Sequence, residues 1–305
     1  MQADSTDNEN DTVGRSRPDS GASDTDVVVF DEVGFTYPSS SATASGRPAL
    51  DGVSFRIAQG EFCCVLGANG SGKSTLAHHI DALLTCASGR VDVLGLDASV
   101  PENASRIRQG VGLVFQNPDD QSLAPTVARD VAFGPENLGL NPSEIESRVS
   151  KALIAVGISD LADEEVSRLS GGQRQRVAIA GALALQPEIL VLDEPATMLD
   201  PRGRQELMQL LERLNAQGLC IVLITHFMDD IASAGHVLVM DGGHLAFDGT
   251  PEELVASPKK VEEFGLELPF SYRVSLELNK RGIEVVPTLD VRELEAELCR
   301  SYSTR

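Results

Sequence analysis

The stretch Gly67-Ala68-Asn69-Gly70-Ser71-Gly72-Lys73-Ser74 decides the fold of this chain. It follows the apolar run 62–66 and precedes the helix-compatible run 73–84. G-x-x-x-x-G-K-S between a strand and a helix is the pattern of a phosphate-binding loop, whereas a glycine-rich turn with a chance Lys-Ser is the alternative. Glycines let backbone N–H groups point inward, and the helix N-terminus adds partial positive charge. We therefore expect Lys73 to reach the β- and γ-phosphates of a nucleotide, and Ser74 to bind Mg²⁺.

The composition is that of a globular protein with an acidic surface. Hydrophobic residues make up 42% of the chain, and no apolar run is long enough to span a membrane. The net charge of −21 argues against general nucleic-acid binding, and the N-terminus lacks the pattern of a signal peptide. The five cysteines form no C-x-x-C pair, so a zinc site or a disulfide framework is not expected, and a reducing cytosolic location fits.

Short apolar runs separated by helical patterns organise the rest of the chain. Residues 1–26 are polar and acidic and are predicted to be a disordered tail. The strands are expected at 26–35, 53–57, 62–66, 90–94, 111–115, 189–192 and 220–224, and the main helices at 73–84, 143–156, 172–185 and 202–217. Ser143 with Glu146 has capping-box spacing, and 236–247 is predicted to be a hairpin around Asp241-Gly242-Gly243. This alternation predicts an α/β fold with a mostly parallel sheet covered on both faces.

Two further motifs carry chemistry. The apolar strand 189–192 runs into Asp193-Glu194, which resembles a Walker B element: Asp193 would hold Mg²⁺, and Glu194 would act as general base toward the attacking water. Leu169-Ser170-Gly171-Gly172-Gln173 opens a helix and offers a second anion site at a helix N-terminus. A chain with one phosphate-binding loop has no evident use for two, so we expect this segment to close on a nucleotide held by another subunit. A strand-terminating acidic turn and a plain serine cap are the alternatives.

Together with Gln116 and Thr225-His226, these motifs occur in the order typical of the ATP-binding cassette (ABC) ATPases, which the chain resembles over residues 27–250. The resemblance implies an ABC ATPase fold with a RecA-like parallel core sheet, an antiparallel β subdomain, a helical signature subdomain and a short C-terminal extension at 251–305. It implies a head-to-tail dimer with two ATP molecules at the interface, each between Lys73 of one subunit and Ser170–Gln173 of the other.

The resemblance also implies roles for single residues. Gln116 would be the Q-loop glutamine that senses Mg²⁺ and the membrane partner, His226 the switch histidine at the γ-phosphate, and Asp200 the D-loop aspartate. Tyr37 would stack on adenine, and Thr75 would join the phosphate-binding loop. His78, His79, His236 and His244 receive no role and are expected to be ordinary helix and loop residues.

Local departures from the family pattern occur at two places. Ala196-Thr197 replaces a common Thr-Ser after the Walker B element, which keeps a hydroxyl at 197. Glu164 and Val166 replace an Arg and a Pro before the signature, in the segment that faces membrane partners.

A finer resemblance is to the ATPase subunits of energy-coupling factor (ECF) transporters, which import vitamins and transition-metal ions such as cobalt and nickel. It rests on the segments 115–121 and 130–139 and on two stretches of the tail, 268–270 and 280–283. It implies a peripheral protein on the cytoplasmic face of the cell membrane, paired with an identical or related ATPase and driving a membrane T-component with a substrate-binding S-component. The acidic pair Asp119-Asp120 would meet a basic coupling helix.

Two other function classes stay open at this point. A non-transport ABC protein would be expected to carry two cassettes, coiled coils or zinc modules, which this sequence lacks. An inactive regulatory subunit would be expected to lack Lys73, Glu194 or His226, all of which are present. The sequence therefore favours a transport ATPase that binds ATP and Mg²⁺.

Overall fold

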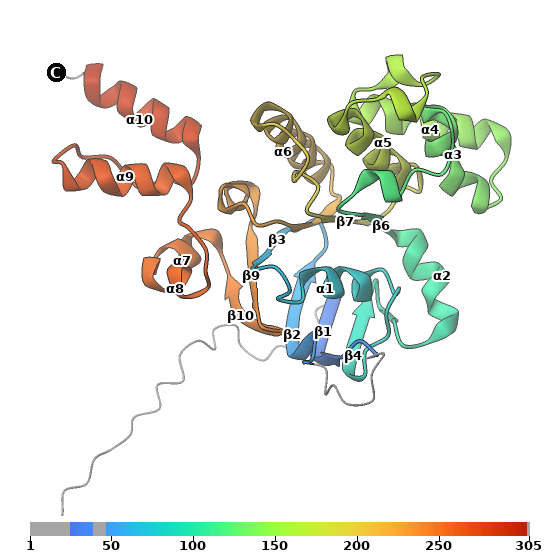
Figure 1. Cartoon of the computed structure of the whole chain (residues 1–305), viewed down its shortest axis with the longest axis horizontal. Helices are drawn as coiled ribbons and strands as arrows, with labels where there is room; N and C mark the ends of the chain where they lie inside the picture. Colours follow the sequence, from blue (N-terminus) through green and yellow to red (C-terminus); the bar gives the residue numbers. More distant parts are fainter. Residues whose placement is uncertain (1–24, 39–46, 304–305) are drawn as a thin grey trace, which may run out of the picture.

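A six-stranded sheet forms the centre of the computed structural model, which describes residues 25–38 and 47–303 (Figure 1). Its strand order is β10-β9-β3-β8-β7-β6, and every neighbouring pair is parallel except β9 with β10. The bounds are β3 (Phe62–Gly67), β6 (Val111–Val114), β7 (Ile189–Asp193), β8 (Cys220–Ile224), β9 (His236–Asp241) and β10 (His244–Gly249). The predicted parallel sheet and the hairpin at 236–247 are confirmed.

The central strands are buried on both faces, which is why they are apolar throughout. In β7, Leu190 and Leu192 face one hydrophobic core, while Ile189 and Val191 face a second core across the sheet. This split follows from the alternation of side chains along a strand. Cys63 and Cys64 are buried in β3 and Cys220 in β8, where they act as small core residues.

The second core is covered by an antiparallel sheet of order β2-β1-β4-β5, with helix α1 between the two sheets (Figure 1). Its bounds are β1 (Asp26–Phe35), β2 (Leu50–Ala58), β4 (Ser88–Val93) and β5 (Leu96–Asp97). Asp26, which the predicted tail 1–26 includes, is the first residue of β1 and pairs with Arg56 at 3.4 Å. Residues 1–24 of that tail, and residues 39–46 between β1 and β2, lie outside the described residues.

The first core is covered by helices. Three of them, α3, α4 and α5, form a separate lobe, and α6 lies over the strands of the central sheet (Figure 1). The helix bounds are α1 (Lys73–Ile80), α2 (Pro101–Gly110), α3 (Val127–Asn137), α4 (Pro142–Val156), α5 (Gly171–Ala184) and α6 (Pro201–Ala216). Short 3₁₀ turns occur at η1 (Pro118–Asp120), η2 (Ser159–Leu161), η3 (Val166–Arg168) and η4 (Met228–Ser233).

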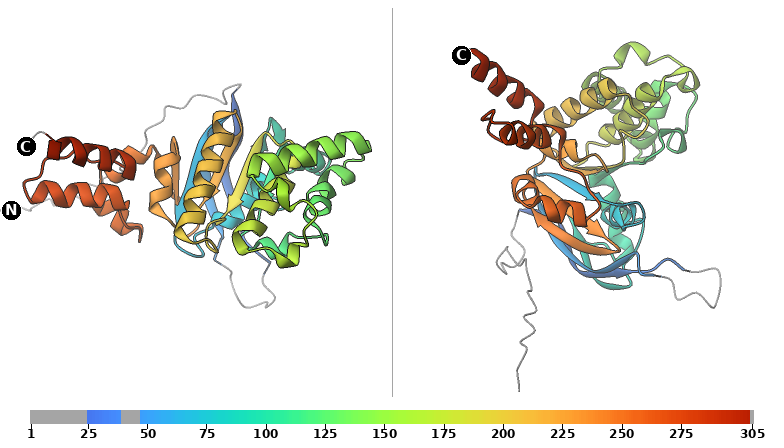
Figure 2. Two further views of the ribbon diagram at one scale, coloured as in Figure 1. Left: turned by 90° about the horizontal axis from the view of Figure 1, so that it is seen from above. Right: turned by 60° about the vertical axis from the view of Figure 1, so that its left-hand side comes forward.

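Four helices follow the last strand: α7 (Pro251–Val255), α8 (Pro258–Glu263), α9 (Phe270–Lys280) and α10 (Val291–Ser303). They lie at the end of the molecule opposite the helical lobe, with the sheets between them (Figure 2). The Asp229 carboxylate of η4 accepts a hydrogen bond of 2.7 Å from the Phe270 N–H, at the first turn of α9. No helix in the described part of the chain combines the length and the apolar character that crossing a bilayer requires.

The predicted capping box at Ser143 is wrong. Helix α4 begins one residue earlier at Pro142, and its cap is Asn141, whose side chain accepts a hydrogen bond of 3.0 Å from the Glu144 N–H. Ser143 donates its hydroxyl to the same Asn141 oxygen. Proline suits the first helical position because its fixed φ matches the helix and it lacks an N–H that would need a partner.

His236 is the first residue of β9, as the predicted hairpin requires, and not the ordinary helix or loop residue that the general expectation for the four histidines gave. It is a buried residue of β9, and its Nε2 lies 2.7 Å from the Asp248 carboxylate of β10. Its Nδ1 lies 3.3 Å from the Glu61 carboxylate, close enough for charge attraction although not aligned as a hydrogen bond. Burial by itself lowers the pKa of His236, but the interactions with Asp248, Cys63 and Glu61 outweigh it and raise the pKa to about 12.

We predict that this histidine makes stability depend on pH. Because the folded pKa of His236 lies above the ordinary value of 6.5, its stabilisation is complete below pH 6.5 and is lost as pH rises toward 12. Between pH 7 and 9, the free energy of unfolding should fall relative to that of a His236→Gln variant, by up to about 1.4 kcal/mol per pH unit. Urea unfolding of both proteins at several pH values measures this, and a constant difference between them would contradict it.

Candidate nucleotide-binding site

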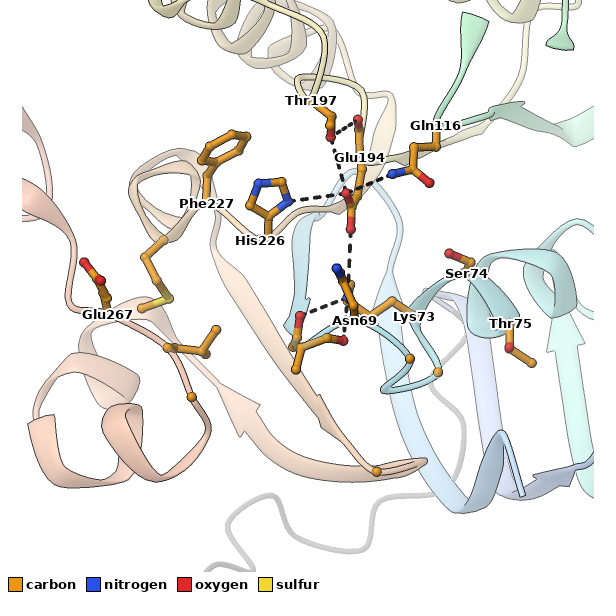
Figure 3. Close-up of a pocket in the computed structure, with 18 of the residues that line it drawn as sticks. Asn69, Lys73, Ser74, Thr75, Gln116, Glu194, Thr197, His226, Phe227 and Glu267 are labelled. Carbon is orange, nitrogen blue, oxygen red and sulfur yellow. Dashed lines mark hydrogen bonds and ion pairs between the residues drawn. The ribbon is translucent and has the colours of Figure 1, made fainter. Parts of the chain in front are cut away.

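The phosphate-binding loop connects β3 to α1, as the sequence predicted (Figure 3). Gly67 and Gly72 have φ angles of 145° and 111°, which side chains rarely adopt. A Cβ at Gly67 would also stand 2.2 Å from the carbonyl oxygen of Met240 on the neighbouring strand β9. Both positions therefore require glycine, which lets the loop turn back over the end of the sheet.

Lys73 is folded back into this loop. Its ammonium group donates hydrogen bonds of 2.9 and 3.0 Å to the carbonyl oxygens of Gly67 and Ala68, and its side chain is only 5% exposed. Burial lowers the pKa of Lys73, while the nearby Glu194 and Asp193 carboxylates act in the opposite direction. The ammonium group is therefore bound by two neutral carbonyl oxygens. It can exchange them for the charged oxygens of a phosphate, which form stronger hydrogen bonds with a cation.

Glu194 brings three chain segments together (Figure 3). One of its carboxylate oxygens lies 3.2 Å from Gln116 Nε2, 3.3 Å from His226 Nδ1 and 3.3 Å from Thr197 Oγ1. The other lies 4.0 Å from the Lys73 ammonium group. The three residues predicted to be catalytic, Gln116, Glu194 and His226, therefore meet at one point above the phosphate-binding loop.

The position of Glu194 follows from its backbone. It is the first residue after β7, and its φ of 47° turns the chain sharply out of the sheet. Its N–H still donates a hydrogen bond of 2.9 Å to the Ile224 carbonyl group at the end of β8. A left-handed conformation is unfavourable for a residue other than glycine, and such conformations gather at functional sites.

Asp193 ends β7 and is 8% exposed, beside Ser74 at the start of α1. Burial raises the pKa of Asp193, and a hydrogen bond with Ser74 opposes that rise. The predicted pair of oxygen donors is thus in contact at the carboxyl end of the sheet, where ligands bind in open α/β folds.

The residues Ser170–Gln173 face a different cavity, whereas Leu169, which was predicted to bind nucleotide with them, is buried in the first core and does not line it. Ser170 accepts a hydrogen bond of 3.3 Å from the Gln173 N–H, and the Gln173 side chain accepts one of 2.8 Å from the Ser170 N–H. These residues share a cavity of about 480 Å³ with Asp200, which caps α6 through the Gly203 N–H at 2.7 Å. Lys73, Gln116, Glu194 and His226 line a separate cavity of about 1160 Å³.

This geometry agrees with the comparisons with known proteins. The family model of the ABC transporters matches residues 50–197. The chain is 47% identical to the energy-coupling factor transporter ATP-binding protein EcfA1 of Symbiobacterium thermophilum, covering 90% of this chain and 98% of that protein. It is 45% identical to EcfA1 of Clostridium perfringens over 83% of this chain and 91% of that protein.

Two solved structures resemble it as well. The structure of cbiO1 from Clostridium perfringens, described as part of the ABC transporter complex cbiONQ, has a TM-score of 0.71 at 34% identity and covers 85% of this chain and 98% of its own. The dimeric cassette MJ0796 with ADP and phosphate has a TM-score of 0.66 at 29% identity. It covers 73% of this chain and 98% of its own chain.

The chain belongs to the ABC transporter ATPases. Within that family it is an ATP-binding subunit of the energy-coupling factor type, since its relatives match along nearly their whole length. The ABC fold expected from the sequence, with its parallel core sheet and antiparallel β subdomain, is confirmed.

Tyr37 lies at the edge of the larger cavity of this ABC ATPase. Its ring packs edge-on against Phe35 with centroids 5.0 Å apart, and its hydroxyl lies 3.2 Å from Thr75 Oγ1. Tyr37 is 49% exposed and is one of the residues that line this cavity.

Several residues around the site were not predicted from the sequence. The cavity is also lined by Phe227 beside His226, and by Leu266, Glu267 and Leu268 of the C-terminal extension (Figure 3). Phe227 directly follows a named motif and could have been considered, whereas nothing in the sequence indicates that 266–268 return to the nucleotide cavity.

Asp119 also has a partner that the sequence did not suggest. It pairs at 2.8 Å with Arg174 of α5, which ties the segment after Gln116 to the signature helix.

We predict that Lys73→Met separates stability from ATP binding. The variant no longer has the free-energy cost of burying an ammonium charge, which offsets the loss of two hydrogen bonds. The unfolding temperature without nucleotide should therefore stay within a few degrees of the wild type. Saturating ATP should raise the unfolding temperature of the wild type, by an amount corresponding to about 2.7 kcal/mol at 100 Kd, but not that of the variant. Thermal unfolding with and without ATP measures both, with the exposed Lys259→Met as control. A full ATP-dependent rise in Lys73→Met would contradict the prediction.

Proposed function

We propose that this chain hydrolyses ATP to power an energy-coupling factor importer for a vitamin or a transition-metal ion such as cobalt or nickel. The observation that carries this proposal is the convergence of Gln116, Thr197 and His226 on the Glu194 carboxylate above Lys73. Residues 27–250 form the ATPase domain, and 251–305 an extension that serves dimerisation or docking.

The site residues support a direct mechanism. Lys73 exchanges the Gly67 and Ala68 carbonyl oxygens for the β- and γ-phosphates, while the loop N–H groups surround the same oxygens. Glu194 accepts a proton from the attacking water. Gln116 and His226 hold the Glu194 carboxylate toward the γ-phosphate. Tyr37 stacks on adenine. The contacts of Glu194 argue against an inactive subunit, because that class has no use for an oriented base.

The residues at the end of β7 fit Mg²⁺. Asp193 and Ser74 provide hard oxygen donors that hydrogen-bond to each other. The side chain of Gln116, whose nitrogen donates to Glu194, has an amide oxygen as a third candidate ligand. When bound, the metal ion would neutralise charge on the β- and γ-phosphates.

The second half of each nucleotide site comes from another cassette, either a second copy or a close relative. Ser170, Gly171, Gly172 and Gln173 lie at the N-terminus of α5 and line a cavity separate from the one that Lys73 lines. Related cassettes form dimers, which supports a head-to-tail arrangement in which this cavity faces the phosphate-binding loop of the partner. Asp200 lies in the same cavity and bridges the two sites.

The membrane partners contact the segment after Gln116 from the cytoplasmic face of the membrane. Asp120 is exposed there, next to the Asp119–Arg174 pair, and Leu123 and Phe133 are large exposed apolar side chains of the same region. This combination suits a basic amphipathic helix of a T-component, with the solute bound by a separate S-component. A non-transport ABC protein is the alternative function.

Affinity purification of the tagged chain from detergent-solubilised membranes tests this proposal. Polytopic membrane proteins that co-purify and stimulate ATP hydrolysis would support it, and mass spectrometry of those partners narrows the solute class. Co-purification of ribosomes or repair proteins, with no membrane protein, would favour the alternative.

We predict that Glu194→Gln abolishes turnover but retains ATP binding. The amide has the shape of the carboxylate but cannot accept the proton, so kcat should fall at least 100-fold while ATP affinity changes little. The variant should accumulate as an ATP-dependent dimer, which light scattering after size exclusion detects. Glu102→Gln, an exposed change on α2, is the control, and unchanged turnover in Glu194→Gln would remove Glu194 from the role of base.

A further inference from the structure

A buried ion pair lies directly behind the switch histidine. Asp230 is 3% exposed, and one of its oxygens accepts hydrogen bonds of 3.0 and 2.7 Å from Nε and Nη2 of Arg204 on α6. Its other oxygen accepts a hydrogen bond of 2.7 Å from the Thr225 hydroxyl. The same hydroxyl accepts the Phe227 N–H at 3.1 Å, so the backbone on both sides of His226 is fixed by one carboxylate.

Arg204 also contacts the aromatic ring beside the histidine. Its guanidinium carbon stands 3.9 Å above the Phe227 ring centroid, within the range of a cation–π interaction. Phe227 in turn packs on His226, with ring centroids 4.1 Å apart and planes tilted by 36°. The ring of Phe227 therefore lies between a fixed cation and the imidazole, and Figure 3 shows it next to His226.

His226 needs such support because it is 42% exposed, and the polar contact recorded for its ring is an approach of Nδ1 to the Glu194 carboxylate at 3.3 Å that is not aligned as a hydrogen bond. A half-exposed imidazole held at one atom samples several orientations in solution. Packing of one face against Phe227 restricts these orientations, and a misplacement of about 1 Å in an active site can cost about 100-fold in rate.

We infer that Arg204 is a positioning residue for His226, acting through Phe227 and Asp230. This inference deepens the proposed function and rests on it. Arg204 lies one helical turn after Asp200, and its N–H donates to the Asp200 carbonyl oxygen at 2.9 Å. The helix that presents Asp200 to the signature cavity thus also sets the orientation of the switch histidine in the same chain.

A purely structural role of Arg204 and a positioning role predict different turnover for a variant in which a second substitution restores stability. Arg204→Met leaves Asp230 buried without its cation and is expected to lower the unfolding temperature. Arg204→Met/Asp230→Asn removes that unpaired charge and should recover most of the unfolding temperature, yet it lacks the cation over Phe227. Phe227→Leu leaves the Arg204–Asp230 pair intact and removes only the stacked ring.

The test measures kcat, KM for ATP and the unfolding temperature of the full chain, with its partner cassette if it requires one. We expect kcat to fall about 10-fold or more in Phe227→Leu and in Arg204→Met/Asp230→Asn, with KM changed less than about twofold. Phe227→Tyr and Arg204→Lys, which keep the ring or the charge, should recover much of the loss. Arg213→Met, an exposed change on the same helix, is the control.

Turnover within twofold of the wild type in both Phe227→Leu and the folded double variant would overturn the inference. A kcat that simply follows the unfolding temperature across the series would overturn it too, because it would assign Arg204 to stability alone. His226→Ala distinguishes failure of the proposed function from failure of the Arg204 inference. If that variant keeps full turnover, the switch role in the proposed function fails and this inference fails with it, whereas an inactive His226→Ala leaves the Arg204 series decisive.

Discussion

The Glu194 carboxylate is the point on which the site depends. A carboxylate that is 11% exposed must have partners, and here they come from three segments and from the cation of the phosphate-binding loop. Each partner stands at the carboxyl end of a parallel strand or just beyond it: Lys73 after β3, Gln116 after β6 and His226 after β8. The parallel sheet is therefore what turns separated motifs into one cluster.

The same constraint accounts for the proposed division of each nucleotide site between two chains. The N-terminus of α5 and its Ser170–Gln173 capping box belong to the helical lobe, and they line their own cavity with Asp200. The strands that hold Glu194 and Lys73 end at a different cavity. A highly charged nucleotide that contacts both cavities would neutralise two positive sites at once, which would link closure of the two subunits to the presence of the γ-phosphate.

Much of this site could be predicted from the sequence because its parts are local. The phosphate-binding loop, the Asp193-Glu194 pair and the Ser170 cap are each set by a few consecutive residues, and the apolar strands around them indicated the sheet. The interactions that were missed join residues distant in the chain. The Arg204–Asp230 pair, the burial of His236 between Asp248 and Glu61, and the Asp119–Arg174 pair depend on how elements pack. No periodicity in the sequence reports such contacts.

The central claim is that ATP is held between two cassettes, and a cryo-electron microscopy structure of the transporter trapped with ATP and Mg²⁺ tests it most directly. The account predicts a nucleotide whose γ-phosphate contacts Lys73 of this chain and, from the facing cassette, the serine and glycines at its signature-helix N-terminus. A nucleotide enclosed by a single chain, with residues 170–173 open to solvent in both subunits, would contradict it.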